Sequence, residues 1–138
     1  MLSTIEQAVE ARLVAAAPRM PTIPVTLHYD RNDPFAVRMT FPAPATLAGV
    51  EICWTFSRDL LAAGLAGPEG KGDVRVRPYG YDRTVLEFHA PEGMAVVHLH
   101  SGDVRRFLAA TAELVPMGRE HLQLDLDGGL AALMRDAC

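Results

Sequence analysis

Three histidines are the clearest candidates for chemistry in this sequence, because imidazole nitrogens bind zinc and exchange protons near neutral pH. His98 and His100 stand two residues apart, so on a strand they share one face. The alternating stretches on either side of residues 90–93 predict a hairpin, which places His89 too far along to join the other two. It also places Arg83 opposite His100, and an arginine is a poor neighbour for a cation. We therefore expect no metal site.

Carboxylate pairs and serines are the other residues suited to acid–base or nucleophilic work. In each case, however, the local sequence is that of a turn or a helix cap, where these residue types are favoured for backbone reasons. The residues concerned are Asp30 with Asp33, Asp125 with Asp127, Ser57 and Ser101. We expect no catalytic residue, no enzyme activity and no cofactor.

The glycine-rich stretch 67–73, GPEGKGD, invites comparison with a phosphate-binding loop. It lacks the spacing of such a loop, and it follows a predicted helix and precedes a predicted strand, which is the reverse of the order that directs a helix N-terminus at phosphate. This stretch is interpreted as a turn.

Basic residues cluster after that turn, with Tyr79 and Tyr81 among them and only Asp73 and Asp82 to offset them. Basic residues interleaved with aromatic ones can form a groove for single-stranded nucleic acid. Solvated charge on a strand face is the more usual explanation, and both interpretations remain open. The cluster consists of Lys71, Arg75, Arg77 and Arg83.

Composition narrows the class of protein. The chain has 138 residues, enough for one domain with its own core, and it shows no internal repeat or linker; we assign residues 1–138 to a single domain. A net charge of −4 argues against general binding along a phosphate backbone. No apolar run reaches the length of a membrane span, and the N-terminus lacks a signal-peptide pattern. We expect a cytoplasmic protein in which Cys53 and Cys138 are free thiols.

Hydrophobic periodicity predicts strands in the first half of the chain. The opening segment fits either a helix or a strand and is assigned as a strand running into Val14. Further strands are predicted over 25–29, 35–41 and 50–56. Ser57 then caps a short helix through Leu65, in which Gly64 allows close approach to the sheet.

The second half is predicted to add strands over 74–77, 85–89 and 94–100. The hairpin register places Leu86 opposite Val97 and Phe88 opposite Ala95 on the core side. Ser101 is expected to cap a longer helix that ends before Pro116, and a last helix is expected around Leu130, Leu133 and Met134. The fold class is α+β: antiparallel sheets of about seven strands, a short central helix and two C-terminal helices.

The pattern of these residues resembles the SsgA-like family of sporulation and cell-division proteins. The strongest matching motifs are Leu27-x-Tyr29-Asp30-x-x-Asp33-Pro34-Phe35-Ala36-Val37, Trp54-x-Phe56-x-Arg58-Asp59-Leu60-Leu61-x-x-Gly64-Leu65 and Gly70-x-Gly72-Asp73-Val74-Arg75-Val76. Weaker matches follow in 107–127, whereas 78–103 shows little similarity.

The resemblance implies a non-enzymatic adaptor that helps to position septa during sporulation, at division septa, through protein–protein contacts that include recruitment of the tubulin-like GTPase FtsZ. It also implies a whirly-like fold and a homotrimer, and nucleic acid is not an expected partner. Arg58 and Asp59 are the motif residues without an obvious core role; they either tie the helix to the structure or face a partner. The candidate partner or nucleic-acid surface is therefore Arg58, Asp59, Lys71, Arg75, Arg77 and Arg83.

Overall fold

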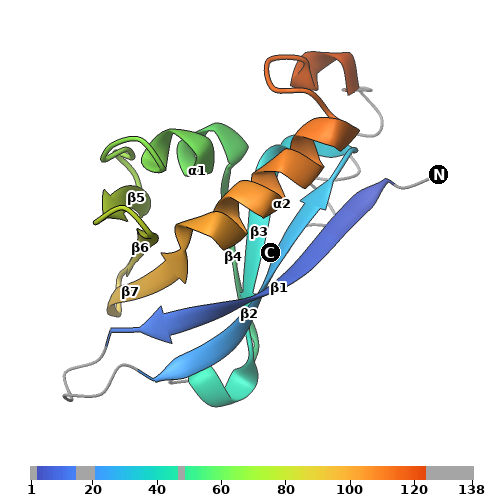
Figure 1. Ribbon diagram of the computed structural model, residues 1–138. Coiled ribbons are helices and arrows are strands. Elements are labelled where there is room, and N and C mark those ends of the chain that lie inside the picture. Colours follow the sequence, from blue (N-terminus) through green and yellow to red (C-terminus); the bar gives the residue numbers. More distant parts are fainter. Residues whose placement is uncertain (1–2, 15–20, 47–48, 124–138) are drawn as a thin grey trace.

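Seven antiparallel strands form one curled sheet in the computed structural model, which describes residues 3–14, 21–46 and 49–123 (Figure 1). Two α-helices lie against the sheet, so the predicted α+β class with about seven strands is confirmed. The elements are β1 (Thr4–Leu13), β2 (Thr22–Asp30), β3 (Asp33–Phe41), a 3₁₀ turn (Ala43–Ala45), β4 (Ile52–Ser57), α1 (Arg58–Gly64), β5 (Val74–Tyr79), β6 (Arg83–Ala90), β7 (Gly93–His100), α2 (Ser101–Leu114) and a second 3₁₀ turn (Glu120–Gln123).

The opening strand β1 joins two local meanders. The strand order is β4-β3-β2-β1-β7-β6-β5, so each half of the sheet follows the chain and β1 links them. It pairs with β2 along its length but with β7 only through Ala11, Arg12 and Leu13. The assignment of the ambiguous opening segment as a strand is confirmed.

The β6–β7 hairpin has the predicted register. Leu86 lies opposite Val97, and His98 lies opposite Val85. Leu86 and Val97 are both buried, as expected for the core side, whereas Ala95 on the same face is exposed. The turn is tight, with β6 ending at Ala90 and β7 beginning at Gly93.

The sheet curls enough to bring its two end regions into contact. Phe88 of β6 packs against Trp54 of β4, with ring centroids 5.2 Å apart, and against Phe41 and Phe56 at 5.5 and 6.2 Å. Aromatic side chains bury large areas and favour such tilted and edge-on contacts. This aromatic group therefore holds the curl from inside.

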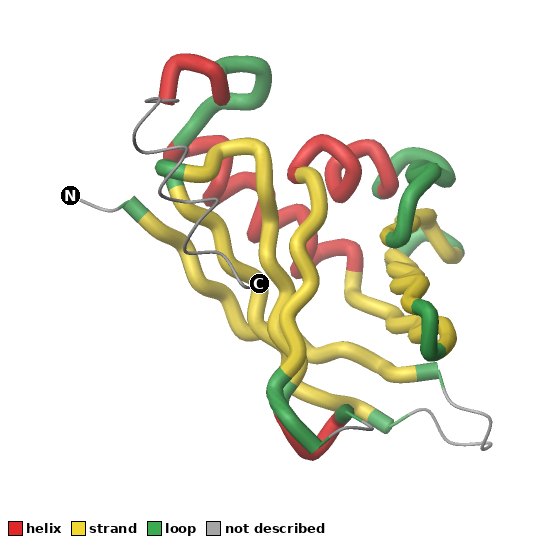
Figure 2. The backbone as a smooth tube through the Cα atoms, turned by 180° about the vertical axis from the view of Figure 1, so that it is seen from behind, coloured by secondary structure: helices red, strands yellow, loops and turns green. Residues whose placement is uncertain are grey.

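Both helices lie on the inner face of this curl. α2 crosses in front of the sheet in Figure 1 and lies behind the strands in Figure 2. Val104, Phe107 and Leu108 of α2 are buried in the same core cluster as the inward residues of the strands. In the described residues, the opposite face of the sheet has no helix packed on it.

α1 begins as the sequence predicts. The Ser57 hydroxyl accepts a hydrogen bond from the Leu60 amide at 3.0 Å, which satisfies one of the free N–H groups of the first turn. Gly64 lies against β5 so closely that a Cβ there would stand 2.2 Å from Val76 Cγ1. The predicted close approach of this helix to the sheet is confirmed.

The prediction that Ser101 caps α2 is wrong. The helix begins at Ser101 itself, and the residue before it, His100, makes no side-chain capping bond. The Ser101 hydroxyl is buried and lies 2.8 Å from the Thr84 hydroxyl on β6. This serine therefore anchors the helix start to the sheet.

Other expectations concern the cysteines and the C-terminal region. The predicted last helix and the pair Asp125 and Asp127 lie outside the described residues. The expectation of a free thiol is wrong for Cys53, whose sulfur is disulfide-bonded in the structure. Cys138 lies outside the described residues.

Candidate functional site

The most deeply buried charge is on Arg58, the first residue of α1. Its side chain is 0% exposed. Nη1 donates to the carbonyl oxygens of Val115 at 2.7 Å and Thr111 at 3.2 Å, both at the C-terminal end of α2. Nη2 lies 3.2 Å from a carboxylate oxygen of Glu120, which is itself buried. Arg58 thus ties α1 to the end of α2 and to the turn beyond it.

Tyr29 of β2 completes this buried arginine centre. The Arg58 guanidinium carbon lies 4.9 Å from the centre of the Tyr29 ring, a cation–π contact. The Tyr29 hydroxyl donates to the Pro34 carbonyl oxygen at 2.9 Å. Burial, only partly offset by Arg58, raises the pKa of Tyr29 to about 12, so the phenol stays protonated. A protonated, hydrogen-bonded tyrosine and a fully enclosed guanidinium hold structure and offer nothing to a substrate.

Arg58 therefore does not belong to the predicted partner or nucleic-acid surface. Asp59, next to it in the sequence, is exposed at the start of α1, where the helix dipole favours a negatively charged side chain. The structural role that the sequence left open for the pair applies to Arg58 alone. Its main partners, Thr111, Val115 and Glu120, are distant in sequence, and no local pattern signals that they converge on it.

The histidines do not form a metal site. His89 Nε2 lies 3.2 Å from Glu87 Oε1 on β6, whereas His98 and His100 lie toward the far end of β7. Across the described ranges, no group of three or more histidine, cysteine, aspartate or glutamate residues is arranged to hold a metal ion.

A group of basic residues gathers on the outer face of the sheet. In one cross-strand row, Arg12 of β1 pairs with His98 of β7, which pairs with Val85 of β6, which pairs with Arg77 of β5. In the next row, Arg83 lies between His100 and Tyr79. Sequence reasoning found Arg77 and Arg83, and considered His98 only as a metal ligand. It missed Arg12, because only the pairing of β1 with β7 brings Arg12 to this place.

Lys71 and Arg75 lie at the margin of this face. Both are exposed, Lys71 in the turn before β5 and Arg75 opposite Glu87. Glu87 also forms an ion pair with Arg77 at 3.3 Å. Burial raises the pKa of Glu87, but bonds from His89 and Arg77 outweigh it and lower the pKa overall.

His98 lies at the centre of the arginines. Its Nδ1 is buried and has no hydrogen-bond partner among the described residues, and its ring packs on Tyr79 with centroids 5.2 Å apart. Burial, followed by the charges of Arg83, Arg77 and Arg12, lowers the pKa of His98. The imidazole is therefore neutral near pH 7, and the arginines carry the charge of this face.

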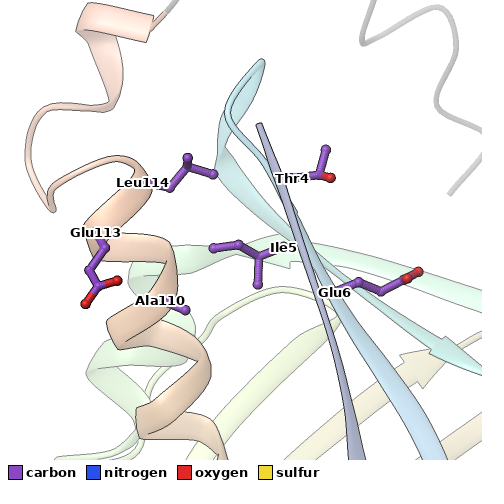
Figure 3. A pocket seen from close by; sticks show the side chains of 6 residues that line it. All are labelled: Thr4, Ile5, Glu6, Ala110, Glu113 and Leu114. Atoms are coloured by element: carbon purple, nitrogen blue, oxygen red, sulfur yellow. The ribbon is translucent and has the colours of Figure 1, made fainter. Parts of the chain in front are cut away.

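A shallow groove of about 380 Å³ opens between β1 and α2 (Figure 3). Ile5 and Leu114 point toward each other across it, with Ala110 beside them. The two acids at its edges point to opposite sides, and Glu6 instead contacts His28 at 3.2 Å on the outer face. The groove therefore brings no pair of acids together for acid–base chemistry.

Comparison with known proteins now bears on the fold and on the buried arginine centre. The family model described as Streptomyces sporulation and cell division protein, SsgA, matches residues 23–120. That range contains the whole buried arginine centre. The chain belongs to the SsgA family.

Individual relatives agree with this SsgA assignment over most of their length. The sporulation-specific cell division protein SsgB of Streptomyces coelicolor is 36% identical, over 99% of this chain and 100% of its own. The SsgB of Kineococcus radiotolerans is 40% identical, over 86% of this chain and 72% of its own.

Solved structures show the same fold. One, from work on mutations in SsgB that correlate to longitudinal cell division during sporulation of Streptomyces coelicolor, superposes with a TM-score of 0.79 at 35% identity, over 88% of this chain and 96% of the other. The SsgA-like sporulation-specific cell division protein of Thermobifida fusca gives a TM-score of 0.80 at 29% identity, over 95% and 96%. Within the described residues, no helix is long and apolar enough to cross a membrane.

Proposed function

We propose that this protein is a non-enzymatic cell-division adaptor that helps to position septa during sporulation. The observation that carries the proposal is the end-to-end match to the SsgB of Streptomyces coelicolor, which is named as a sporulation-specific cell division protein. That match covers 99% of this chain and 100% of the relative, so the likeness extends over all the elements of the fold.

The arrangement of the polar residues supports an adaptor. The deepest charged group, Arg58 with Glu120, is enclosed and ties elements together. Arg12, Arg77 and Arg83 lie on a sheet face on which no described helix packs, and the groove between β1 and α2 is mostly apolar. Open faces of this kind suit contacts with another protein better than they suit the enclosure of a small substrate.

The adaptor acts, in this proposal, by recruiting the tubulin-like GTPase FtsZ to future septa. The biochemical test is co-sedimentation of purified protein with FtsZ polymers assembled with GTP. Unassembled FtsZ with GDP is the matched control, since only assembled FtsZ should carry the protein into the pellet. Equal amounts in the pellet with and without polymer would refute recruitment.

The cellular test is the position of a fluorescent fusion during sporulation, in the host that encodes the protein. We expect cytoplasmic protein that gathers at septa before they close. Deletion should misplace or abolish sporulation septa, and the intact gene should restore them. Normal septa in the deletion strain would exclude the division role.

Self-association is part of the same proposal. The family resemblance favours a homotrimer, which would present several copies of one surface to a polymer and so strengthen weak single contacts. Light scattering coupled to size-exclusion chromatography should give three times the 15.0 kDa chain mass. A monomeric mass at the concentrations used for co-sedimentation would contradict the homotrimer and leave the proposed role in division unaffected.

A further inference from the structure

Three arginines converge around one histidine on the outer face of the sheet. Arg12, His98 and Arg77 share a cross-strand row, and Arg83 stands two residues from Val85 of that row on the same face. Arg12 lies on β1, His98 on β7, Arg83 on β6 and Arg77 on β5, and the pairing register of these four neighbouring strands brings the residues together. We call this group, Arg12, Arg77, Arg83 and His98, the arginine face.

Most of the positive charge of the arginine face is uncompensated. Of the three arginines, only Arg77 has an ion-pair partner among the described residues, Glu87 at 3.3 Å. Like charges on neighbouring strands repel and destabilise the pairing that holds them there. A bound anion would relieve that repulsion.

The arginine face also has a fixed platform. Tyr79 packs on His98, and Val85 between them in the sheet is 0% exposed although it lies outside the hydrophobic core. The buried Nδ1 of His98 has no hydrogen-bond partner in the described part of the chain. A guanidinium group is a rigid planar fork, so it loses little freedom for each bond formed when it binds a carboxylate with two parallel hydrogen bonds.

We propose that the arginine face docks an acidic stretch of a partner protein. The proposal rests on the proposed function only in taking the partner to be a protein. The carboxylates of the stretch would pair with Arg12 and Arg83, which lie in neighbouring rows. Arg77 would either keep its ion pair with Glu87 while also contacting the stretch, or leave Glu87 for a carboxylate of the stretch.

An acidic peptide fits the arginine face better than single-stranded nucleic acid does. A nucleic-acid groove continues its positive charge along the strand and offers free aromatic faces for the bases. Here Glu10 on β1, Glu87 on β6 and Asp82 before β6 bound the positive charge. The ring of Tyr79 already packs on His98.

The test is fluorescence anisotropy with a labelled glutamate-rich peptide, the same peptide with glutamine at every glutamate, and labelled oligothymidylate. The full-length protein should bind the glutamate peptide, less tightly as salt rises, and neither of the other probes. The double variant Arg12→Gln with Arg83→Gln should weaken peptide binding about tenfold or more, because it removes two charge-assisted contacts. Lysine at both positions should restore part of the affinity.

The matched control is Arg105→Gln with Arg119→Gln, which removes two exposed charges from α2 and the turn after it. This variant should bind the peptide as the wild type does. Equal loss in both double variants, binding of oligothymidylate in place of the peptide, or no peptide binding by the wild type would each overturn the proposal.

Co-sedimentation with FtsZ polymers separates this inference from the proposed function. If the variant at Arg12 and Arg83 pellets with polymer as well as the wild type does, recruitment stands without the arginine face, and the peptide measurement decides whether that face docks an acidic stretch of another partner. If the wild type itself fails to pellet, recruitment is wrong, and the peptide measurement alone decides the arginine face.

Discussion

Arg58 at the start of α1 and Glu120 in the turn after α2 form a fully buried ion pair, with Nη2 and Oε2 3.2 Å apart. Nε and Nη2 of Arg58 make no well-directed hydrogen bond, so the contact with Glu120 is mainly one of charge. Burying two charges is costly, and removing one of them leaves the other without compensation. The pair therefore makes the fold depend on the turn around Glu120.

Replacing Arg58 tests this dependence. Arg58→Met should lower the free energy of unfolding by about 3–5 kcal/mol, because Glu120 is left buried and unpaired. The double variant with Glu120→Gln should cost much less than the sum of the single changes, which urea denaturation in a double-mutant cycle would measure. Additive costs would show that the two side chains do not interact.

Acid should weaken the fold through Glu120. Burial raises the pKa of this carboxyl, but hydrogen bonds from its own amide and the Gly118 amide, together with the nearby positive charge of Arg58, outweigh burial and lower the pKa from 4.5. Because the pKa is lower in the folded state, the ionised carboxylate stabilises the fold at pH values above the unfolded-state pKa. This stabilisation is lost as the pH falls through the folded-state pKa. Urea denaturation from pH 5 downward should show this loss, and Glu120→Gln should reduce it. An unchanged slope in the variant would contradict the assignment.

His98 should add a second pH dependence at milder acidity. Burial and three arginines lower the pKa of His98 from 6.5, so the unfolded chain takes up this proton first and stability falls as pH drops below 6.5. Thermal denaturation across this range should show a smaller decline in His98→Asn. His100→Asn, on the same strand face, controls for loss of an imidazole; an equal effect in both variants would argue against His98.

Gly64 and Gly102 make a matched pair for helix packing. A Cβ at position 64 would meet Val76 Cγ1 at 2.2 Å, whereas one at position 102 in α2 meets nothing within 4 Å. Gly64→Ala should destabilise by about 1–3 kcal/mol through overpacking. Gly102→Ala should stabilise by up to about 1 kcal/mol. Denaturant unfolding measures both variants; loss of stability in both would refute the packing argument.

Local patterns predicted much of this fold, because the signals lie within a few residues of the structure they form. Period-two alternation on both sides of residues 90–93 predicted the β6–β7 register, which the structure confirms. The cap at Ser57 and the close approach of the helix to the sheet at Gly64 were also predicted from local patterns, and the structure shows both. Ser101 was assigned as a cap by residue type alone, and the buried Thr84 hydroxyl that lies next to its hydroxyl is on β6, far from it in the sequence.

The functional residues were harder to predict, because their neighbours come from distant parts of the chain. A charged residue in the first turn of a helix is usually exposed, and nothing near Arg58 in the sequence indicates that Glu120 and Tyr29 enclose it. The arginine face likewise depends on the pairing of Arg12 with His98. Alternation predicts which face a residue occupies, but not which strands become neighbours.

The short pairing of β1 with β7 has a consequence for the order of folding. β1 to β4 and β5 to β7 are each made of sequential neighbours, which close small loops and so form early. The strand pairing between the two units runs through Ala11, Arg12 and Leu13, whose partners, residues 97–99, leave the ribosome much later. During synthesis β1 must wait with one edge unpaired, and an open edge strand can pair with a second nascent chain. Completing β7 removes that hazard and assembles the arginine face in the same step.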